Sequence, residues 1–331
     1  MRIKIAFISQ PEYFRFMYEQ ELNDFAETME FKFIYPMSHK DFSELLAFDA
    51  TINFFFRGEF VPNEVLEQLN GIKVNLSSEP FPRIIEGKKE FTADSIERYF
   101  TFRTIRNKRY DYVFHYDASS LSFMKSDGLL LSGDFAFPVA TSIYKPENIL
   151  KQWDLFFIGR STTHREAFFS PLKHYYNFLH IAHGIWGEGL VKYINSSRIC
   201  LNVHAENEVS WEPRLQMLLA CGAFVISEKI TPNKYLCPGL DFVEISNQHE
   251  MFDAVTYYLN CDGERQSIAS NGFDKINNLL CSKCNFTNLI EGIIQERYPR
   301  FSTKQSQFSM EIYLEICKLI KIMVNRLKNI N

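Results

Sequence analysis

The stretch Tyr193–Glu228, YINSSRICLNVHAENEVSWEPRLQMLLACGAFVISE, decides the fold. It predicts a helix end, a buried strand at Ile199–Val203, a polar loop, a helix that begins near Trp211 and a second buried strand at Ala223–Ser227. Its polar residues cluster where the first strand ends and the helix begins. Ligands bind at that edge of α/β sheets, and helix N-termini favour anions. The stretch therefore predicts a nucleotide or phosphate pocket.

Length and composition indicate a globular protein with two domains. The chain has 331 residues, of which 46% are hydrophobic and 23% charged, and one domain usually takes roughly 100–200 residues. Its net charge of −4 argues against nucleic acid as a partner. The seven cysteines predict reduced core thiols rather than disulfides. Without a signal peptide or an apolar run of about 20 residues, we expect a cytoplasmic protein.

Buried strands alternate with helical segments along both halves of the chain, an order typical of parallel sheets. In the first half, strands are predicted at Ile3–Ile8, Phe31–Tyr35, Ala50–Phe56, Ile72–Leu76 and Tyr110–Tyr116, with Leu129–Leu131 as a sixth before a linker at Pro138–Pro146. In the second half, strands are predicted at Leu155–Gly159, Phe178–Ala182, Ile199–Val203, Ala223–Ser227 and Asp241–Ile245, followed by helices at Asn247–Leu259 and Glu264–Leu279. This layout predicts two parallel α/β domains, at 1–146 and 147–300.

Residues 301–331 predict an amphipathic, basic C-terminal helix. From Phe308 onward, apolar residues recur at helical spacing, and residues 302–331 carry five Lys or Arg and two Glu, a local net charge of +3. Such a helix suits an anionic membrane surface, which would make the protein peripheral at the inner face of the cytoplasmic membrane. The alternative is packing against the protein itself or self-association with another subunit.

Five blocks of the second half, in order, resemble the C-terminal half of GT-B glycosyltransferases of the group 1 type, and most of all their spore-coat-protein-like branch. The blocks are YINSSRICLNVHAENE, RLQMLLACGAFVISE, YLCPGLDFVEIS, HEMFDAVTYYLN and ERQSIASNGFDKI, within about residues 150–298. The resemblance implies two Rossmann-like domains that face each other across a cleft. It also implies transfer of a sugar from a nucleotide-sugar donor to a bacterial surface glycan or lipid-linked glycan, as in lipopolysaccharide or capsule polysaccharide biosynthesis.

The resemblance places the donor in the C-terminal domain and the acceptor mainly in the N-terminal domain. Family members carry an Arg, two residues and then a Glu that contacts the donor, whereas this chain has Arg214 and then Met217. A thioether cannot accept hydroxyl hydrogen bonds as a carboxylate does. We therefore expect either that Glu212 or Gln216 takes over that contact or that the donor differs.

The predicted donor-binding residues are Arg160, Ser161, His204, Glu212, Arg214 and Gln216. Each of the main ones has a structural alternative. The loop that holds Arg160 and Ser161 also suits an ordinary helix cap, and His204 suits a hydrogen-bonded core histidine. Glu212 and Arg214 also suit a solvated first turn of a helix.

Two other functions stay open. Glu212 followed by Pro213 resembles the Glu-Pro pair of Kdo transferases, which suggests a CMP-Kdo-dependent, retaining enzyme in which Arg214 meets a phosphate or carboxylate. The departure at Met217 also fits a non-catalytic nucleotide- or sugar-binding subunit that keeps the fold. The nucleotide is therefore UDP, GDP or CMP.

The loop Asn75–Arg83, NLSSEPFPR, follows a predicted strand of the N-terminal domain and is stiffened by two prolines. Glu79 is the predicted catalytic carboxylate, as base or as nucleophile, and Asp134 is a second candidate. Arg57 and Arg83 are the predicted acceptor-binding residues. The alternative is a rigid surface loop with solvated charges.

Three motifs are absent from the sequence: an Asp-x-Asp pair, Gly-x-Gly-x-x-Gly and the P-loop. We therefore expect an enzyme that uses neither a metal nor a cofactor, apart from its nucleotide-sugar co-substrate. In such an enzyme Arg side chains and helix N-termini would neutralise the leaving phosphate.

Overall fold

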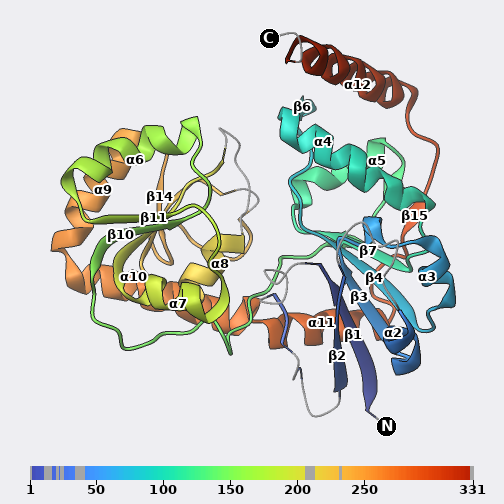
Figure 1. Cartoon of the computed structure of the whole chain (residues 1–331), viewed down its shortest axis with the longest axis horizontal. Helices are drawn as coiled ribbons and strands as arrows, with labels where there is room; N and C mark the ends of the chain where they lie inside the picture. Colours follow the sequence, from blue (N-terminus) through green and yellow to red (C-terminus); the bar gives the residue numbers. More distant parts are fainter. Residues whose placement is uncertain are drawn as a thin grey trace. The chain divides into compact units, whose positions relative to one another are not determined.

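The computed structural model describes residues 2–10, 17–19, 22, 26–33, 42–205, 213–230 and 233–328, with side chains up to residue 319. The chain divides into two compact units (Figure 1). The first unit comprises Met1–Gln10, Phe25–Ala136 and Gly292–Asn331, and the second comprises Pro11–Asp24 and Phe137–Glu291. The first unit is therefore assembled from the beginning and the end of the chain.

The first unit contains a six-stranded parallel sheet in the order β2-β1-β3-β4-β7-β9. Its strands are β1 (Ile3–Ser9), β2 (Ala26–Lys32), β3 (Ile52–Phe56), β4 (Ile72–Ser77), β7 (Tyr112–His115) and β9 (Gly133–Asp134). All five residues of β3 are buried, as expected of a parallel strand covered on both faces. The predicted strands at residues 3–8, 50–56, 72–76 and 110–116 are thereby confirmed.

Two predictions in this half need correction. The strand predicted at Phe31–Tyr35 is β2, which begins at Ala26, and the described part of it ends at Lys32. The strand predicted at Leu129–Leu131 is β8 (Leu129–Leu130), but it pairs antiparallel with β15 (Ser302–Thr303) and not with the main sheet. The sixth strand of the sheet is β9, because Gly133 and Asp134 continue beside β7.

The remaining elements of the first unit surround its sheet. They are α2 (Ser43–Phe48), η1 (Gly58–Phe60), α3 (Asn63–Gln68), the hairpin of β5 (Arg83–Ile85) and β6 (Lys88–Glu90), α4 (Ala93–Phe102), η2 (Arg103–Asn107), η3 (Ala118–Ser120), α5 (Leu121–Ser126) and α12 (Phe308–Lys328). The predicted C-terminal helix is thus present as α12. Its residues Met310, Leu314 and Cys317 join the core of this unit.

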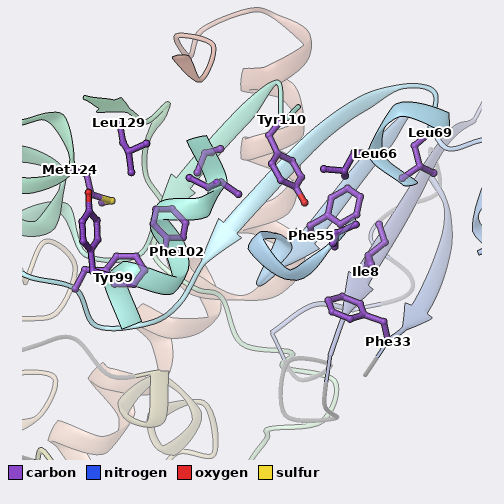
Figure 2. Close-up of a cluster of buried hydrophobic side chains, with 14 of the residues drawn as sticks. Ile8, Phe33, Phe55, Leu66, Leu69, Tyr99, Phe102, Tyr110, Met124 and Leu129 are labelled. Atoms are coloured by element: carbon purple, nitrogen blue, oxygen red, sulfur yellow. The ribbon is translucent and has the colours of Figure 1, made fainter. Parts of the chain in front are cut away.

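One core cluster of the first unit connects the sheet to the helices that cover it. Figure 2 shows Phe55 and Tyr110 near the sheet, with Tyr99, Phe102 and Met124 farther along the same cluster. The Phe55 and Tyr110 rings meet edge to face, with centroids 5.4 Å apart. Such aromatic packing adds about 0.5–1.5 kcal/mol beyond the burial of area.

A buried carboxylate joins the end of α4 to the end of α5. Asp127 accepts hydrogen bonds from Tyr99 Oη at 2.7 Å and from Arg103 Nε and Nη2 at 2.7 and 2.9 Å, and Arg106 Nη2 lies 2.9 Å away. Burial by itself would raise the pKa of Asp127, but these hydrogen bonds and the two guanidinium charges outweigh it and lower the pKa. The network fixes α4, which carries a residue of the candidate site.

The second unit contains a five-stranded parallel sheet in the order β11-β10-β12-β13-β14. Its strands are β10 (Trp153–Ile158), β11 (Phe178–Ile181), β12 (Ser197–Asn202), β13 (Val225–Glu228) and β14 (Val243–Ile245). All five correspond to predicted strands. The two sheets confirm a fold of two parallel α/β units.

Helices lie between and after the strands of the second unit (Figure 1). They are α6 (Thr163–Tyr175), α7 (Gly187–Asn195), α8 (Pro213–Ala220), α9 (Gln248–Asn260), α10 (Asp262–Lys275), the π-helical turn η4 (Ile276–Leu280) and α11 (Ser282–Ile294). The helix predicted at Glu264–Leu279 is therefore α10 followed by η4. Among the described residues, no helix has the length and apolar character needed to cross a membrane.

The deciding stretch folds as predicted wherever it is described. Strand β12 is followed by α8 and then by β13, and the loop residues 206–212 lie outside the described residues. Helix α8 ends in a turn at Gly222, whose φ of 67° favours glycine. The N–H of Gly222 donates to Leu219 O at 2.9 Å, which closes the helix and directs the chain into β13.

Candidate functional site

The carboxyl ends of β10, β12 and β13 form one edge of the second sheet, and the predicted donor residues follow these ends. The loop after β10 begins at Gly159, whose φ is 145°. A Cβ at this position would lie 3.2 Å from Arg165 Nη1 and 3.2 Å from the Phe157 ring. Glycine therefore lets the loop pass closely over a buried arginine.

Arg165, in the first turn of α6, holds two loops of this edge together. Only 3% of the residue is exposed. Its Nε donates to Val203 O at 3.0 Å and its Nη1 to Arg160 O at 2.9 Å. It therefore joins the loop after β10 to the residue that follows β12.

Arg214, in the first turn of α8, contacts the same carbonyl and the same aromatic ring as Arg165. Its Nη1 donates to Asn202 Oδ1 at 2.9 Å and to Val203 O at 3.3 Å. The guanidinium carbons of Arg165 and Arg214 lie 4.9 and 4.8 Å from the centroid of the Phe157 ring. Two positive charges that share one aromatic ring make this edge suitable for an anion.

His204 is buried, with 3% of the residue exposed, and is the second residue after β12. Its ring Nε2 is 2.8 Å from Lys229 O, so Nε2 carries the proton, since a carbonyl only accepts. Its backbone N–H donates to Glu228 Oε2 at 2.7 Å, while His164 Nε2 lies 2.8 Å from Glu228 Oε1. Glu228 at the end of β13 thus joins β12 to α6.

Gln216, on α8, is completely buried. Neither its Oε1 nor its Nε2 has a hydrogen-bond partner among the residues that the structure describes. A buried amide without partners costs about 1–3 kcal/mol. The side chain, two residues after Arg214 in the sequence, therefore carries one acceptor and one donor group that are buried without partners.

The other predicted donor residues differ in what the structure says of them. Arg160 and Ser161 are exposed in the loop after β10. Ser161 Oγ donates to Glu166 Oε1 at 2.6 Å, and Thr162 Oγ1 caps α6 by accepting from the Arg165 backbone at 3.2 Å. Glu212 lies outside the described residues.

The first unit gathers charged residues at the carboxyl end of its own sheet. Arg57, directly after β3, adopts a left-handed backbone with φ of 64°. It pairs with Glu59 at 2.6 Å and with Glu79, and Arg98 of α4 pairs with the second oxygen of Glu79. The structure thus brings Arg57 and Glu79 into contact, and a strained non-glycine residue of this kind is common at functional sites.

Arg83 lies near the buried carboxylate of Asp117 at the same end of the sheet. Burial raises the pKa of Asp117, while hydrogen bonds from Ser119 and the charge of Arg83 partly offset the rise. Asp134 ends β9 and is in register with His115 of β7. Burial lowers the pKa of His115 to about 3, so this ring is neutral.

Several residues of these edges were not predicted from the sequence, namely Arg165, His164, Glu228 and Arg98. Arg165 stands three residues after Thr162, which is the spacing of a capped first turn, but its main partner Val203 is far away in the sequence. Within the described ranges, no cluster of three or more His, Cys, Asp or Glu has the arrangement of a metal site.

Comparison with known protein families finds a match within the second unit. Residues 159–280 match the family model described as glycosyl transferase-like. The match begins at the glycine loop after β10 and includes Arg165, His204, Arg214 and Glu228. No curated protein matches the chain by sequence.

Solved glycosyltransferases share the fold. HepE from Anabaena, in complex with UDP-glucose, has a TM-score of 0.60 at 8% identity over 89% of this chain and all of its own. An α-glucosyltransferase with UDP-glucose and DNA has 0.57 at 10% identity over 89% of this chain and all of its own. Sucrose-phosphate synthase from Thermosynechococcus elongatus has 0.56 at 9% over 89% of this chain and all of its own.

The protein thus has the GT-B fold, with a six-stranded and a five-stranded parallel α/β unit. Residues 159–280, within the second unit, are similar to the glycosyl transferase-like family.

The buried amide of Gln216 gives the first test. In Gln216→Leu we expect the ligand-free protein to gain about 1 kcal/mol of stability, since an apolar side chain of similar size removes the two unpartnered groups. Thermal or urea unfolding measures the change. Met217→Leu, on the same helix, is the control and should shift stability less. Destabilisation by Gln216→Leu alone would show that the amide is already satisfied.

Proposed function

We propose that this protein is a glycosyltransferase that transfers a sugar from a nucleotide-sugar donor to a glycan or lipid-linked glycan acceptor of the bacterial surface. The observation that carries the proposal is the pair Arg165 and Arg214, which lies at the carboxyl edge of β10 and β12 inside the glycosyl transferase-like segment. Charge develops on the leaving nucleotide phosphate during transfer. Fixed guanidinium groups stabilise such charge best where water is excluded.

We propose that the donor occupies the edge of the second unit. Arg214 would bind the phosphates, while Arg165 acts through the backbone, since it holds Arg160 and Val203 in place. Gln216 would give its unpartnered amide to the nucleoside or sugar. UDP is the favoured nucleotide because HepE and the α-glucosyltransferase are described with UDP-glucose, and this also favours a hexose over Kdo.

We propose that the acceptor binds at the edge of the first unit, with Glu79 as the catalytic carboxylate. Arg57 and Arg98 contact its two oxygens and so fix its orientation. A carboxylate has about four lone-pair directions, so two guanidinium contacts leave room for an acceptor hydroxyl. Arg83 and Asp134 at the same edge remain proposed for acceptor binding and for acid chemistry.

Nucleotide binding tests the donor site. We expect UDP to raise the Tm more than GDP or CMP does. At a UDP concentration of about a hundred times Kd, the free energy of unfolding should rise by about 2.7 kcal/mol. Arg214→Ala should weaken UDP binding about 10- to 100-fold, because a charged hydrogen bond contributes about 1.5–3 kcal/mol. Thermal shift and calorimetry measure both effects.

Arg198→Ala is the matched control for Arg214→Ala. Arg198 lies at the amino end of β12, where it donates to Leu259 O at 2.7 Å, away from the donor edge. It should leave nucleotide affinity unchanged. A larger shift with CMP would favour the Kdo reading, and no shift with any of the three nucleotides would refute the donor site.

Glu79→Gln tests the catalytic carboxylate. We expect turnover to fall about 10²- to 10⁴-fold, the usual contribution of a positioned base, while the UDP shift stays intact because the donor edge is unchanged. Release of UDP in the presence of an acceptor glycolipid extract measures turnover. Glu67→Gln, in an exposed pair with Arg109 at 3.4 Å, is the control. Wild-type turnover in folded Glu79→Gln would assign Glu79 a purely structural role.

Helix α12 presents a second apolar face that the core does not use. Met310, Leu314 and Cys317 are buried, but Phe308, Ile312, Ile316 and Leu319 are 45–77% exposed and recur every three or four residues. Phe91 after the β5–β6 hairpin is 47% exposed, and its ring contacts Tyr313 of α12. Lys88, Lys89 and Lys318 lie on the same two elements, together with the exposed glutamates Glu86, Glu90, Glu311 and Glu315.

We propose that this apolar surface of α12 and the hairpin lies on an anionic membrane, where a lipid-linked acceptor would be found, because residues 302–331 carry a net charge of +3. Apolar side chains enter the interface and lysines bind the headgroups, each contributing about 1 kcal/mol. The helix is drawn beside β6 in Figure 1, and Lys89 Nζ lies 4.2 Å from the Tyr313 ring centroid. Both elements therefore belong to one surface.

Vesicle sedimentation tests this surface. We expect the protein to bind phosphatidylglycerol vesicles but not phosphatidylcholine vesicles, and salt to weaken binding. The double variant Ile312→Asn/Ile316→Asn should release it, whereas Leu240→Asn, at an exposed leucine of the second unit, should not. If the Ile312→Asn/Ile316→Asn variant sediments unchanged, or if it instead dissociates a dimer seen by light scattering, the lipid proposal is wrong.

A further inference from the structure

A pocket of about 710 Å³ lies in the second unit, away from the donor residues. It is an open pocket, lined by the segment before β10, by the first residue of that strand and by helix α7 with the loop before it. The donor residues follow the carboxyl ends of the strands, whereas this pocket reaches Trp153 at the amino end of β10. Its size is within the range of about 300–1,000 Å³ usual for small-molecule sites.

Three aromatic residues and a few polar groups line the pocket. Trp153, Trp186 and Tyr193 provide ring surfaces, and Gln152 and Lys192 provide hydrogen-bonding groups. Among the described lining residues, Lys192 is the one that carries a charge. Apolar ring surface combined with a few directed polar groups is the pattern of a small-molecule binding site.

The backbone around the pocket is fixed before any ligand binds. The N–H groups of Gln152 and Trp153 both donate to Ser196 O, at 2.7 and 3.2 Å. Lys151 Nζ donates to Asn195 O at 2.8 Å, which ties the segment before β10 to the end of α7. The Tyr193 ring stacks on Phe156 with an interplanar angle of 10°. A preformed wall costs less entropy on binding.

Two glycines keep the pocket open. A Cβ at Gly184 would meet no atom within 4 Å, and one at Gly189 would meet only Ile185 Cγ2, at 3.5 Å. Gly189 lies on the exposed side of α7, where glycine costs about 1 kcal/mol of helix stability relative to alanine. The glycine therefore leaves space beside α7 but lowers the stability of this helix.

We propose that this pocket binds a pyranose ring of the acceptor glycan, at a second site separate from the donor edge. One face of a pyranose carries only C–H bonds and packs against an aromatic ring, whose π-face is negative. The hydroxyls at its rim suit the amide of Gln152 and the ammonium of Lys192. The proposal rests on the proposed function only in naming the acceptor as the source of the sugar.

Binding of defined oligosaccharides tests the pocket in the full-length protein. The probes are maltopentaose, cellopentaose, laminaripentaose and chitopentaose, with sorbitol as a polyol that has hydroxyls but no ring face. Trp153 and Trp186 are two of the three tryptophans, so intrinsic fluorescence reports on the pocket. We expect a saturable change with at least one pentasaccharide and none with sorbitol. No saturable change with any of the four overturns the proposal.

Gly189→Leu fills the pocket without disturbing the backbone, because Gly189 has no positive φ and its Cβ has room. We expect it to weaken the pentasaccharide at least about tenfold, equivalent to about 1.4 kcal/mol, and to raise the Tm by about 2–4 °C. Gly263→Leu, at another unobstructed helical glycine of the same unit, is the matched control and should bind as the wild type does.

The outcomes separate this proposal from the proposed function. If UDP still raises the Tm but no pentasaccharide binds, the pocket proposal fails and the donor site stands. If a pentasaccharide binds equally to Gly189→Leu, the sugar lies elsewhere and the pocket proposal is wrong. If pentasaccharides bind but no nucleotide does, the pocket stands and the glycosyltransferase proposal fails.

Discussion

The ring of Phe157 is the contact on which the donor edge depends. It is the fifth residue of a buried strand, and two guanidinium groups lie within 5 Å of its centroid. Each such contact contributes about 0.5–2 kcal/mol, more where water is excluded. The same two arginines hold the carbonyl of Val203, so the ring positions the ends of β10 and β12 together. Like charges are tolerated this close because an aromatic face and backbone carbonyls surround them.

The edge of the first unit is instead held together by ion pairs between arginines and glutamates. Glu79 forms ion pairs with Arg57 and Arg98, and Arg57 forms a second ion pair through its Nε with Glu59. The left-handed backbone of Arg57 costs about 1–2 kcal/mol for a residue with a Cβ. Gly58 beside it cannot be larger, because a Cβ would meet Tyr110 Oη at 2.3 Å. The Gly58 N–H donates to Asn75 Oδ1 and Tyr110 Oη donates to Gly58 O, and these hydrogen bonds fix the backbone next to Arg57.

The sequence was sufficient for the central strands but not for the edges of the sheets. Strands such as β3 are buried on both faces, so they read as continuous apolar runs, and they were placed within two residues. Strand β2, AETMEFK, lies at the edge of the sheet and has only one fully buried residue, so its start was missed. The β5–β6 hairpin was missed because its strands have three residues each and its turn uses Glu86 with a positive φ.

The sequence was sufficient to predict where the site residues lie, but not which residues they contact. Arg57, Glu79, His204 and Arg214 were all selected because they follow predicted strands or begin a helix. Their partners come from elsewhere in the chain: Arg98 stands 19 residues after Glu79, and Val203 stands 38 residues after Arg165. Such pairings depend on the packing of helices on the sheet, which hydrophobic periodicity does not encode.

The return of the chain to the first unit has a consequence for synthesis. Strand β15 pairs with β8, and Met310, Leu314 and Cys317 complete a core that begins with β1. On the ribosome, the second unit has all of its residues once position 291 has emerged. The first unit lacks part of its core until the last forty residues follow. The half that begins first is therefore the half that matures last, and a truncated chain leaves its apolar surface open to chaperones.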